Sequence, residues 1–202
     1  MTTSTSTSAD ACTTPIPTDL VPYRITICGL RELMIHAEKG VSHVVTILDP
    51  SYPDPEVFEI YPRHQRVVWR FDDHVTPVDG AVMPDEAVVD RILDLGESFR
   101  AATVEHLLIH CHAGVSRSTA TAAILMAQFN PGREEDVFDH LRRIRPRSWP
   151  NSLLIAMADD KLGRDGALVA AMARHHDMIT RAHPDLAEYL RIHGRAHEVR
   201  YD

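Results

Sequence analysis

Residues 110–119 have the sequence HCHAGVSRST and lie between two segments of different pattern. The preceding residues, 105–109, end in a short apolar run that is typical of a buried strand. The following residues, 120–129, are rich in Ala with Ile, Leu and Met, which favours a helix packed on a core. The sequence therefore predicts a strand, a tight loop and a helix, with a cysteine where the strand ends and an arginine where the helix begins.

Such a loop forms an anion-binding site. A chain that turns into a helix N-terminus directs several backbone N–H groups at one point, and the helix dipole adds partial positive charge there. Gly114 permits a backbone conformation that a side chain would forbid. The guanidinium of Arg117 can hold two phosphate oxygens at once. The same surroundings favour the thiolate form of Cys111, which makes it a nucleophile.

The segment resembles the signature loop of the cysteine-dependent protein tyrosine phosphatases, in which His-Cys is followed by five residues and then Arg-Ser or Arg-Thr. Within that family it is most similar to the dual-specificity branch, and it resembles the bacterial type of tyrosine phosphatase. The matching positions are His110, Cys111, Ala113, Gly114, Arg117 and Ser118. The resemblance covers about residues 24–162 and implies an α/β fold with a single, mostly parallel sheet flanked by helices, here with extra C-terminal helices.

The loop has two simpler explanations. One is a buried structural cysteine followed by an ordinary helix. The other is a metal site made by His110, Cys111 and His112. Neighbouring residues along a strand point to opposite faces, so these three side chains cannot converge on one ion, and no metal site is expected.

The rest of the chain alternates between predicted strands and helices. Strands are expected at 24–28, 42–48 and 67–71, and helices at 31–39, around 84–95 and at 134–144, with Asn151 as the N-cap of another helix. This alternation predicts a mostly parallel sheet covered by helices, with the functional site at the carboxyl ends of the strands. Cys111 falls at that edge.

A general acid is expected in the loop 72–80, which leaves the same edge of the sheet. Phosphoester cleavage expels an alkoxide or phenoxide, which a positioned carboxylic acid can protonate. In the phosphatase family a loop aspartate some thirty to forty residues before the cysteine has this role, and Asp73 lies 38 residues before Cys111. The spacing of Phe71, Asp73 and Pro77 favours Asp73 over Asp72. A pair of solvated turn aspartates remains the alternative.

The resemblance also implies the remaining roles. Cys111 attacks phosphorus, Ser118 donates a hydrogen bond to its sulfur, and Asp73 first protonates the leaving group and then activates water. His110 and Asn151 support the loop. No metal or organic cofactor is needed. The expected phosphate-binding residues are His112, Ala113, Gly114, Val115, Ser116 and Arg117.

The predicted function is that of a protein tyrosine phosphatase or a dual-specificity phosphatase. Its expected substrate is a phosphorylated protein, with phosphotyrosine as the favoured residue. Three alternatives stay open: a non-catalytic phosphopeptide-binding module on the same fold, a phosphatase of a small phosphoester, and a thiol redox switch that pairs Cys111 with Cys28.

Composition limits the setting in which this chemistry takes place. The 202 residues carry a formal charge of −8, which argues against nucleic acid as a partner. Three scattered cysteines favour a reducing compartment, and thus the cytoplasm, and no apolar run of about 20 residues spans a membrane. We expect a disordered Ser/Thr-rich tail at 1–20, a phosphatase domain at 21–165 and a helical extension packed on it at 166–202, in a monomer.

Two groups of side chains have structural explanations. An arginine cluster near the end of the 134–144 helix is favoured there by the helix dipole, with recognition of acidic substrate residues as the alternative. It consists of Arg142, Arg143, Arg145 and Arg147. A histidine group in the predicted C-terminal helices is expected on a solvated helical face. It consists of His175, His176, His183, His193 and His197.

Overall fold

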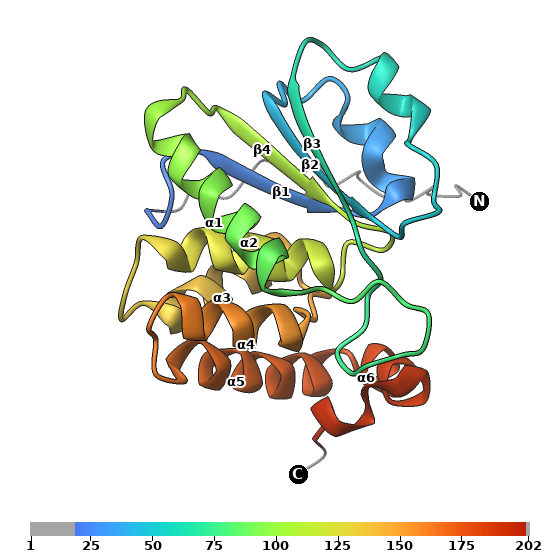
Figure 1. Cartoon of the computed structure of the whole chain (residues 1–202), viewed down its shortest axis with the longest axis vertical. Coiled ribbons are helices and arrows are strands. Elements are labelled where there is room, and N and C mark those ends of the chain that lie inside the picture. The colour runs from blue at the N-terminus through green and yellow to red at the C-terminus, as the bar shows by residue number, and fades with distance from the viewer. Residues whose placement is uncertain (1–18, 201–202) are drawn as a thin grey trace, which may run out of the picture.

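The computed structural model describes residues 19–200 of the chain (Figure 1). The tail expected at 1–20 thus lies outside the described residues, apart from Asp19 and Leu20. Leu20 is buried and belongs to the main apolar core.

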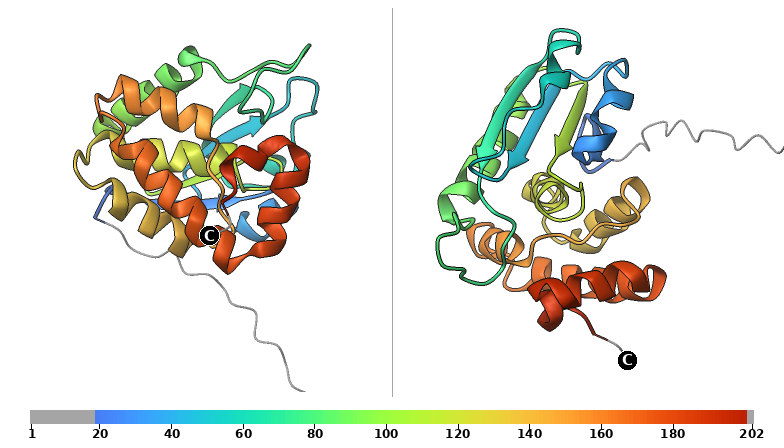
Figure 2. Two further views of the ribbon diagram at one scale, coloured as in Figure 1. Left: turned by 90° about the horizontal axis from the view of Figure 1, so that it is seen from below. Right: turned by 90° about the vertical axis from the view of Figure 1, so that its right-hand side faces the viewer.

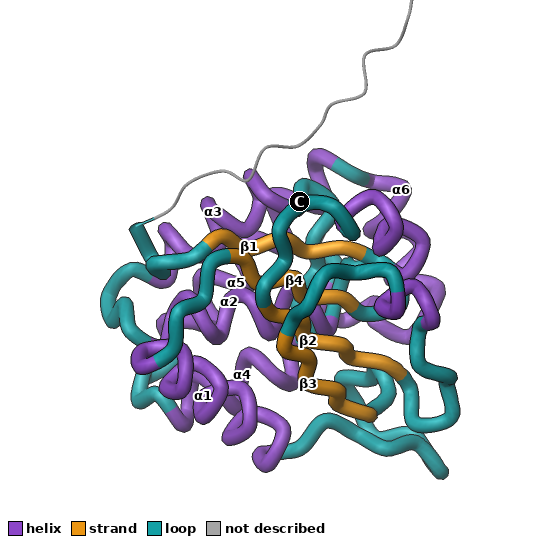
Figure 3. The backbone as a smooth tube through the Cα atoms, turned by 90° about the horizontal axis from the view of Figure 1, so that it is seen from above, coloured by secondary structure: helices purple, strands orange, loops and turns teal. Residues whose placement is uncertain are grey.

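A four-stranded, fully parallel sheet forms the centre of the molecule. Its strands are β1 (Arg24–Cys28), β2 (His43–Leu48), β3 (Gln65–Arg70) and β4 (His106–His110). They lie side by side in the order β1-β4-β2-β3 (Figure 3). The predicted α/β architecture with one parallel sheet is confirmed.

Alternation along the strands gives the sheet two apolar faces. Ile25 and Ile27 of β1 lie in the main core, whereas Cys28 lies in a second cluster on the opposite face. The short 3₁₀ helices η1 (Leu30–His36) and η2 (Glu56–Glu59) close that second cluster. The helix predicted at 31–39 is η1.

The α-helices gather on the other face of the sheet (Figures 1 and 2). They are α1 (Glu86–Ala101), α2 (Arg117–Gln128), α3 (Glu134–Ile144), α4 (Ser152–Lys161), α5 (Ala167–Ala182) and α6 (Pro184–Leu190). The helix α2 begins at Arg117, the arginine expected at its start, and so includes three residues before the Ala-rich run 120–129. No helix among residues 19–200 is long and apolar enough to cross a membrane.

The C-terminal helices are joined to the rest of the molecule by apolar contacts. Leu168 and Met172 of α5 belong to the main core. A third cluster, formed by Trp149, Ile179, Leu186 and Leu190, packs against Val115 of the loop that follows β4. The end of the chain therefore reaches the carboxyl edge of the sheet, where the functional site is expected.

The expected solvated face is wrong for two of the five C-terminal histidines. His175 and His176 are buried, because α5 packs against α3 and α4 on one side and α6 on the other. His175 pairs through Nε2 with Ser148 and through Nδ1 with Arg142, and the His176 ring stacks on Trp149 at a centroid distance of 4.0 Å. Both ring nitrogens of His175 therefore have partners inside the fold, whereas Nε2 of His176 is buried without a hydrogen-bond partner among the described residues.

Candidate active site

The loop between β4 and α2, residues 111–116, is folded tightly against the end of β1. Gly114 has φ +68°, the left-handed conformation that its sequence position predicts. A Cβ at Gly114 would lie 2.4 Å from the carbonyl carbon of Cys28, and a Cβ at Gly29 would lie 2.9 Å from that of Ala113. Glycine at both positions lets the two backbones touch.

All carbonyl groups of residues 112–116 accept hydrogen bonds from neighbouring segments. In order along the loop, the donors are the Leu30 N–H, Arg145 Nη2, Arg145 Nε, the Trp149 N–H and the Ala120 N–H. The N–H and C=O groups of a trans peptide unit point in opposite directions, so the N–H groups of residues 113–117 face the interior of the loop. The loop is thus a cradle of backbone donors.

Cys111 lies at the base of this cradle and is almost completely buried. The Gly114 N–H donates to Sγ at 3.3 Å, and the Ser118 hydroxyl lies 3.2 Å from the same atom. Both groups can donate to a thiolate, and hydrogen bonds to a charged acceptor are the stronger ones.

The guanidinium of Arg117 is buried and held from one side. Nη1 donates to Oδ1 of Asp49 at 2.7 Å and to the carbonyl of Phe71 at 2.6 Å. Nε is buried and meets no hydrogen-bond acceptor within residues 19–200. A buried donor without a partner is costly, and an anion in the cradle would supply one.

Of the two candidate acids, Asp73 faces the cradle. Its Oδ1 accepts from the Ser116 hydroxyl at 2.7 Å and from Asn151 Nδ2 at 3.0 Å. Its Oδ2 lies 4.0 Å from Arg117 Nε. Asp72 instead accepts from the Val82 N–H inside its own loop.

Two histidines flank the cysteine and have different surroundings. His110 is buried, and its Nε2 lies 2.8 Å from the Thr46 hydroxyl; burial lowers its pKa to about 4, so the ring is neutral at pH 7. His112 lies at the rim, with Nε2 3.3 Å from Asp49 and its ring edge-to-face with Tyr52. Burial lowers the pKa of His112, and the neighbouring Asp49 opposes that shift.

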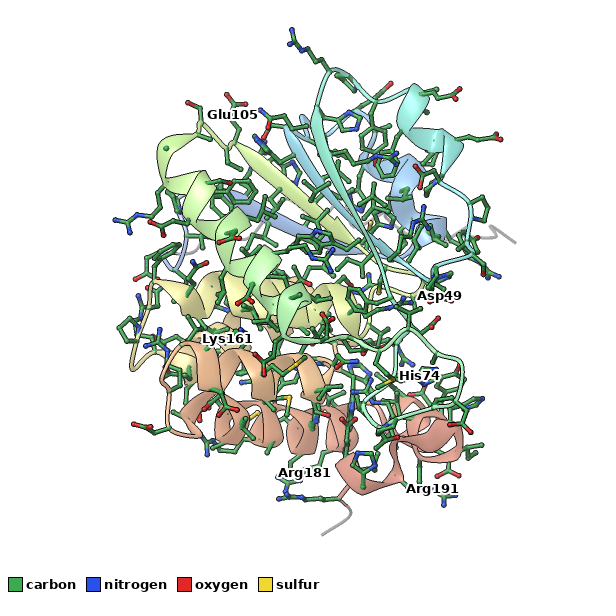
Figure 4. All side chains as sticks on the ribbon, viewed as in Figure 1. Asp49, His74, Glu105, Lys161, Arg181 and Arg191 are labelled. Atoms are coloured by element: carbon green, nitrogen blue, oxygen red, sulfur yellow. The ribbon has the colours of Figure 1, made fainter. Side chains whose placement is uncertain are left out.

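Asn151 caps α4, as predicted, and also connects that helix to the acid. Its Oδ1 accepts from the Leu154 N–H at 3.1 Å, while Nδ2 donates to Asp73 and to the carbonyl of His74. Asp49 and His74 both lie at the carboxyl edge of the sheet (Figure 4). No group of three or more His, Cys, Asp or Glu side chains in the described part of the chain could hold a metal ion.

Similar architectures occur among solved structures. Human DUSP28 is 16% identical over 73% of this chain and 96% of its own, with a TM-score of 0.54. The human tyrosine phosphatase-like serine/threonine/tyrosine-interacting protein is 15% identical over 74% of this chain and 97% of its own, with a TM-score of 0.56. The chain has the protein tyrosine phosphatase fold.

A third example of the phosphatase fold is the Yvh1 phosphatase domain from Chaetomium thermophilum. It is 15% identical over 76% of this chain and 96% of its own, with a TM-score of 0.52. No protein-family model and no curated protein matches the chain at the level of sequence. In this phosphatase fold, Cys111 follows β4 and Arg117 begins α2 at the carboxyl edge of the sheet, and Asp73 approaches Arg117 there.

Three polar contacts of the site were not predicted. Asp49 directly follows β2, and a carboxylate directly after a strand of the parallel sheet is the signal in the sequence that points to it. Arg145 was noted in the arginine cluster, but its bidentate pair with Glu32 joins residues far apart in the chain. Arg195 carries no local signal, since only the packing of α6 brings it to Ser116.

Proposed function

We propose that the chain is a cysteine-dependent phosphatase that hydrolyses phosphoprotein monoesters, phosphotyrosine above all, through a phosphocysteine intermediate. The observation that carries the proposal is the convergence at one point of five inward N–H groups, the unpartnered Nε of Arg117 and the sulfur of Cys111. A phosphate dianion would accept from these N–H groups and from Arg117 with its phosphorus beside the sulfur.

The proposed first step transfers the phosphoryl group to sulfur. Cys111 attacks phosphorus, the phosphorus–oxygen bond to the leaving group breaks, and Asp73 gives that oxygen its proton. The backbone donors and Arg117 stabilise the equatorial oxygens as they spread in the transition state. In the second step Asp73 takes a proton from water, which attacks phosphorus and releases Cys111. Ser118 stabilises the departing thiolate by a hydrogen bond.

The substrate class follows from the side chains of the loop. Residues 112–116 include no lysine or arginine, so a highly charged inositol phosphate gains little electrostatic help beyond Arg117. A single phosphate on a protein side chain requires no more than the cradle provides. We further propose a monomeric enzyme of a reducing, cytoplasmic setting, in keeping with the free thiols of Cys28 and Cys111.

The test is hydrolysis of an aryl phosphate between pH 5 and pH 8 by wild type, Cys111→Ser and Asp73→Asn. We expect wild type to hydrolyse the substrate and Cys111→Ser to be inactive. Asp73→Asn should lose most of the rate, and its rate should no longer decrease at the basic end of the pH profile. The matched control is Asp72→Asn, which should keep the wild-type pH profile.

A phosphopeptide-binding module is the second candidate, because one of the similar structures is named as a phosphatase-like interacting protein. The same proteins distinguish the two. The binding module would be the correct function if wild type hydrolyses neither aryl phosphates nor phosphopeptides but binds a phosphotyrosine peptide. Arg117→Ala should then abolish that binding.

A further inference from the structure

The turn that follows α6 brings a buried arginine to the cradle. Residues 191–198 fold back over the loop that follows β4, and Arg195 is 6% exposed. Its Nη1 donates to the Ser116 hydroxyl at 2.8 Å, and its Nη2 donates to the carbonyl of Pro150 at 3.2 Å.

Glu198 holds the guanidinium from the other side. Arg195 Nε donates to Oε2 of Glu198 at 2.5 Å, and the Trp149 indole N–H donates to the same oxygen at 2.8 Å. The other oxygen, Oε1, accepts from the Ser152 hydroxyl. The side chains of Arg195 and Glu198 are both buried. The hydrogen bonds of Glu198 therefore hold Arg195 in one position.

The bond from Arg195 determines what the Ser116 hydroxyl can do. A hydroxyl has one proton, and its oxygen here accepts from Arg195 Nη1. The proton of Ser116 is therefore directed at the other polar neighbour, Oδ1 of Asp73, at 2.7 Å. Arg195 makes Ser116 a donor to the acid.

These hydrogen bonds determine which of the two oxygens of Asp73 carries the acidic proton. Oδ1 accepts from Ser116 and from Asn151, so a proton on Oδ1 would clash with two donors. The proton of the acid must be on Oδ2, the oxygen that faces Arg117 Nε at 4.0 Å. That oxygen is on the side of the phosphate cradle, where a leaving group departs.

We propose that Arg195 is a positioning residue for the acid step: through Ser116 it holds the proton of Asp73 on Oδ2, toward the leaving group. The proposal rests on the proposed phosphatase function. It gives the C-terminal segment a part in the chemistry, although Arg195 itself touches neither the substrate nor the cysteine.

Leaving-group dependence tests this role. An aryl phosphate with a very acidic phenol needs no protonation, whereas phenyl phosphate does, so a defect confined to the acid step affects only phenyl phosphate. The proteins are wild type, Ser116→Ala and Arg195→Lys, each with Asp73 and with Asp73→Asn. Lysine cannot make the three directed bonds of Arg195. Ser116→Ala leaves the ion pair of Arg195 and Glu198 intact, so it keeps the test decisive if Arg195→Lys folds poorly.

We expect kcat/KM for phenyl phosphate, which reports the first step alone, to fall about tenfold or more in both variants, with kcat/KM for difluoromethylumbelliferyl phosphate within about twofold of wild type. With Asp73→Asn, neither variant should have a further effect. The control is Arg147→Ala, which breaks the surface pair of Arg147 and Asp185 on α6 and should leave both rates unchanged.

An equal loss with both substrates, or a loss that persists with Asp73→Asn, would overturn the positioning role and leave Arg195 a purely structural residue. Wild type without activity toward either substrate is a different outcome, because it overturns the phosphatase function itself.

Discussion

Nη1 of Arg117 donates to Oδ1 of Asp49 at 2.7 Å, and this bond determines which edge of the guanidinium remains for a ligand. With Nη1 also bonded to the Phe71 carbonyl, the edge formed by Nε and Nη2 is the one left to face the cradle. A planar guanidinium that is fixed in this way before binding loses little entropy when it takes up a phosphate.

Removing that carboxylate should weaken phosphate binding. We expect Asp49→Ala to lower kcat/KM for an aryl phosphate and the affinity for inorganic phosphate about tenfold, which corresponds to about one hydrogen bond to a charged group at a partly exposed site. Inhibition by phosphate measures the affinity. Asp54→Ala is the control, because Asp54 pairs with Arg66 and Arg70 on the surface. Equal affinity in Asp49→Ala and wild type would contradict the role of Asp49.

Glu32 stabilises the signature loop from the opposite side. It binds both terminal nitrogens of Arg145, whose Nε and Nη2 also hold the carbonyls of Gly114 and Ala113. We expect Glu32→Gln to lower the free energy of unfolding by about 1 kcal/mol, since the pair is partly exposed, and to lower kcat as the loop loosens. Urea denaturation measures the first effect.

The control for Glu32 is Glu97→Gln, which removes an exposed pair with Arg100 on α1. Its stability should stay within about 0.5 kcal/mol of wild type. Burial alone would raise the pKa of Glu32, but hydrogen bonds from Arg145 and the Gly29 N–H hold it below the usual value. The contribution of Glu32 should therefore persist at neutral pH and be lost only in acid, as the carboxylate is protonated.

His175 should make the fold sensitive to mild acid. Burial lowers its pKa to about 4 from an ordinary value of 6.5, so the unfolded chain binds a proton at this position before the folded chain does. The stabilising contribution is complete above pH 6.5 and is lost as the pH falls toward 4. Between pH 7.5 and pH 5 we expect a loss of about 2 kcal/mol from this residue.

Urea denaturation of wild type, His175→Gln and His197→Gln at these two pH values measures that loss. His175→Gln should be less stable at pH 7.5 and should show a smaller pH dependence, and His197→Gln, at an exposed position, should match wild type. A wild-type pH dependence in His175→Gln would show that other groups cause the acid sensitivity.

Cys28 should not form a disulfide with Cys111. Its thiol lies in the cluster under η1 and η2, on the sheet face opposite to the main core that contains Cys111, and burial together with Glu32 raises its pKa. After mild peroxide we expect a dimedone adduct at Cys111 and an intact thiol at Cys28 by mass spectrometry, with Cys28→Ser as the control. A peptide pair joined through both sulfurs would contradict this prediction.

Local patterns in the sequence were enough to predict the fold. Short apolar runs indicated the strands, and their alternation with helices indicated a parallel sheet. The loop was predicted from the Cys111–Arg117 motif, whose residues are close in sequence. The choice of Asp73 over Asp72 as the acid stays a prediction; in the structure, Asp73 is the one of the two that lies beside Arg117 and Ser116.

Contacts between residues far apart in the chain could not be predicted from the sequence. His175 and His176 were expected at the surface, since the helical pattern of α5 does not reveal that a second helix covers its far side. The bond from Arg195 to Ser116 joins residues 79 positions apart, and it exists only because α6 and the turn after it pack on Trp149. Such pairs require the folded chain.

The contact between Gly29 and Gly114 limits how this protein can evolve. A side chain at Gly114 would overlap the backbone at Cys28 and Gly29, and one at Gly29 would overlap the backbone of Ala113. Neither glycine can be replaced first, and a replacement of both makes the overlap worse. Relatives that retain the cysteine loop should therefore also retain a glycine at the end of the first strand, so this second position, more than 80 residues earlier, is a marker with which to recognise them.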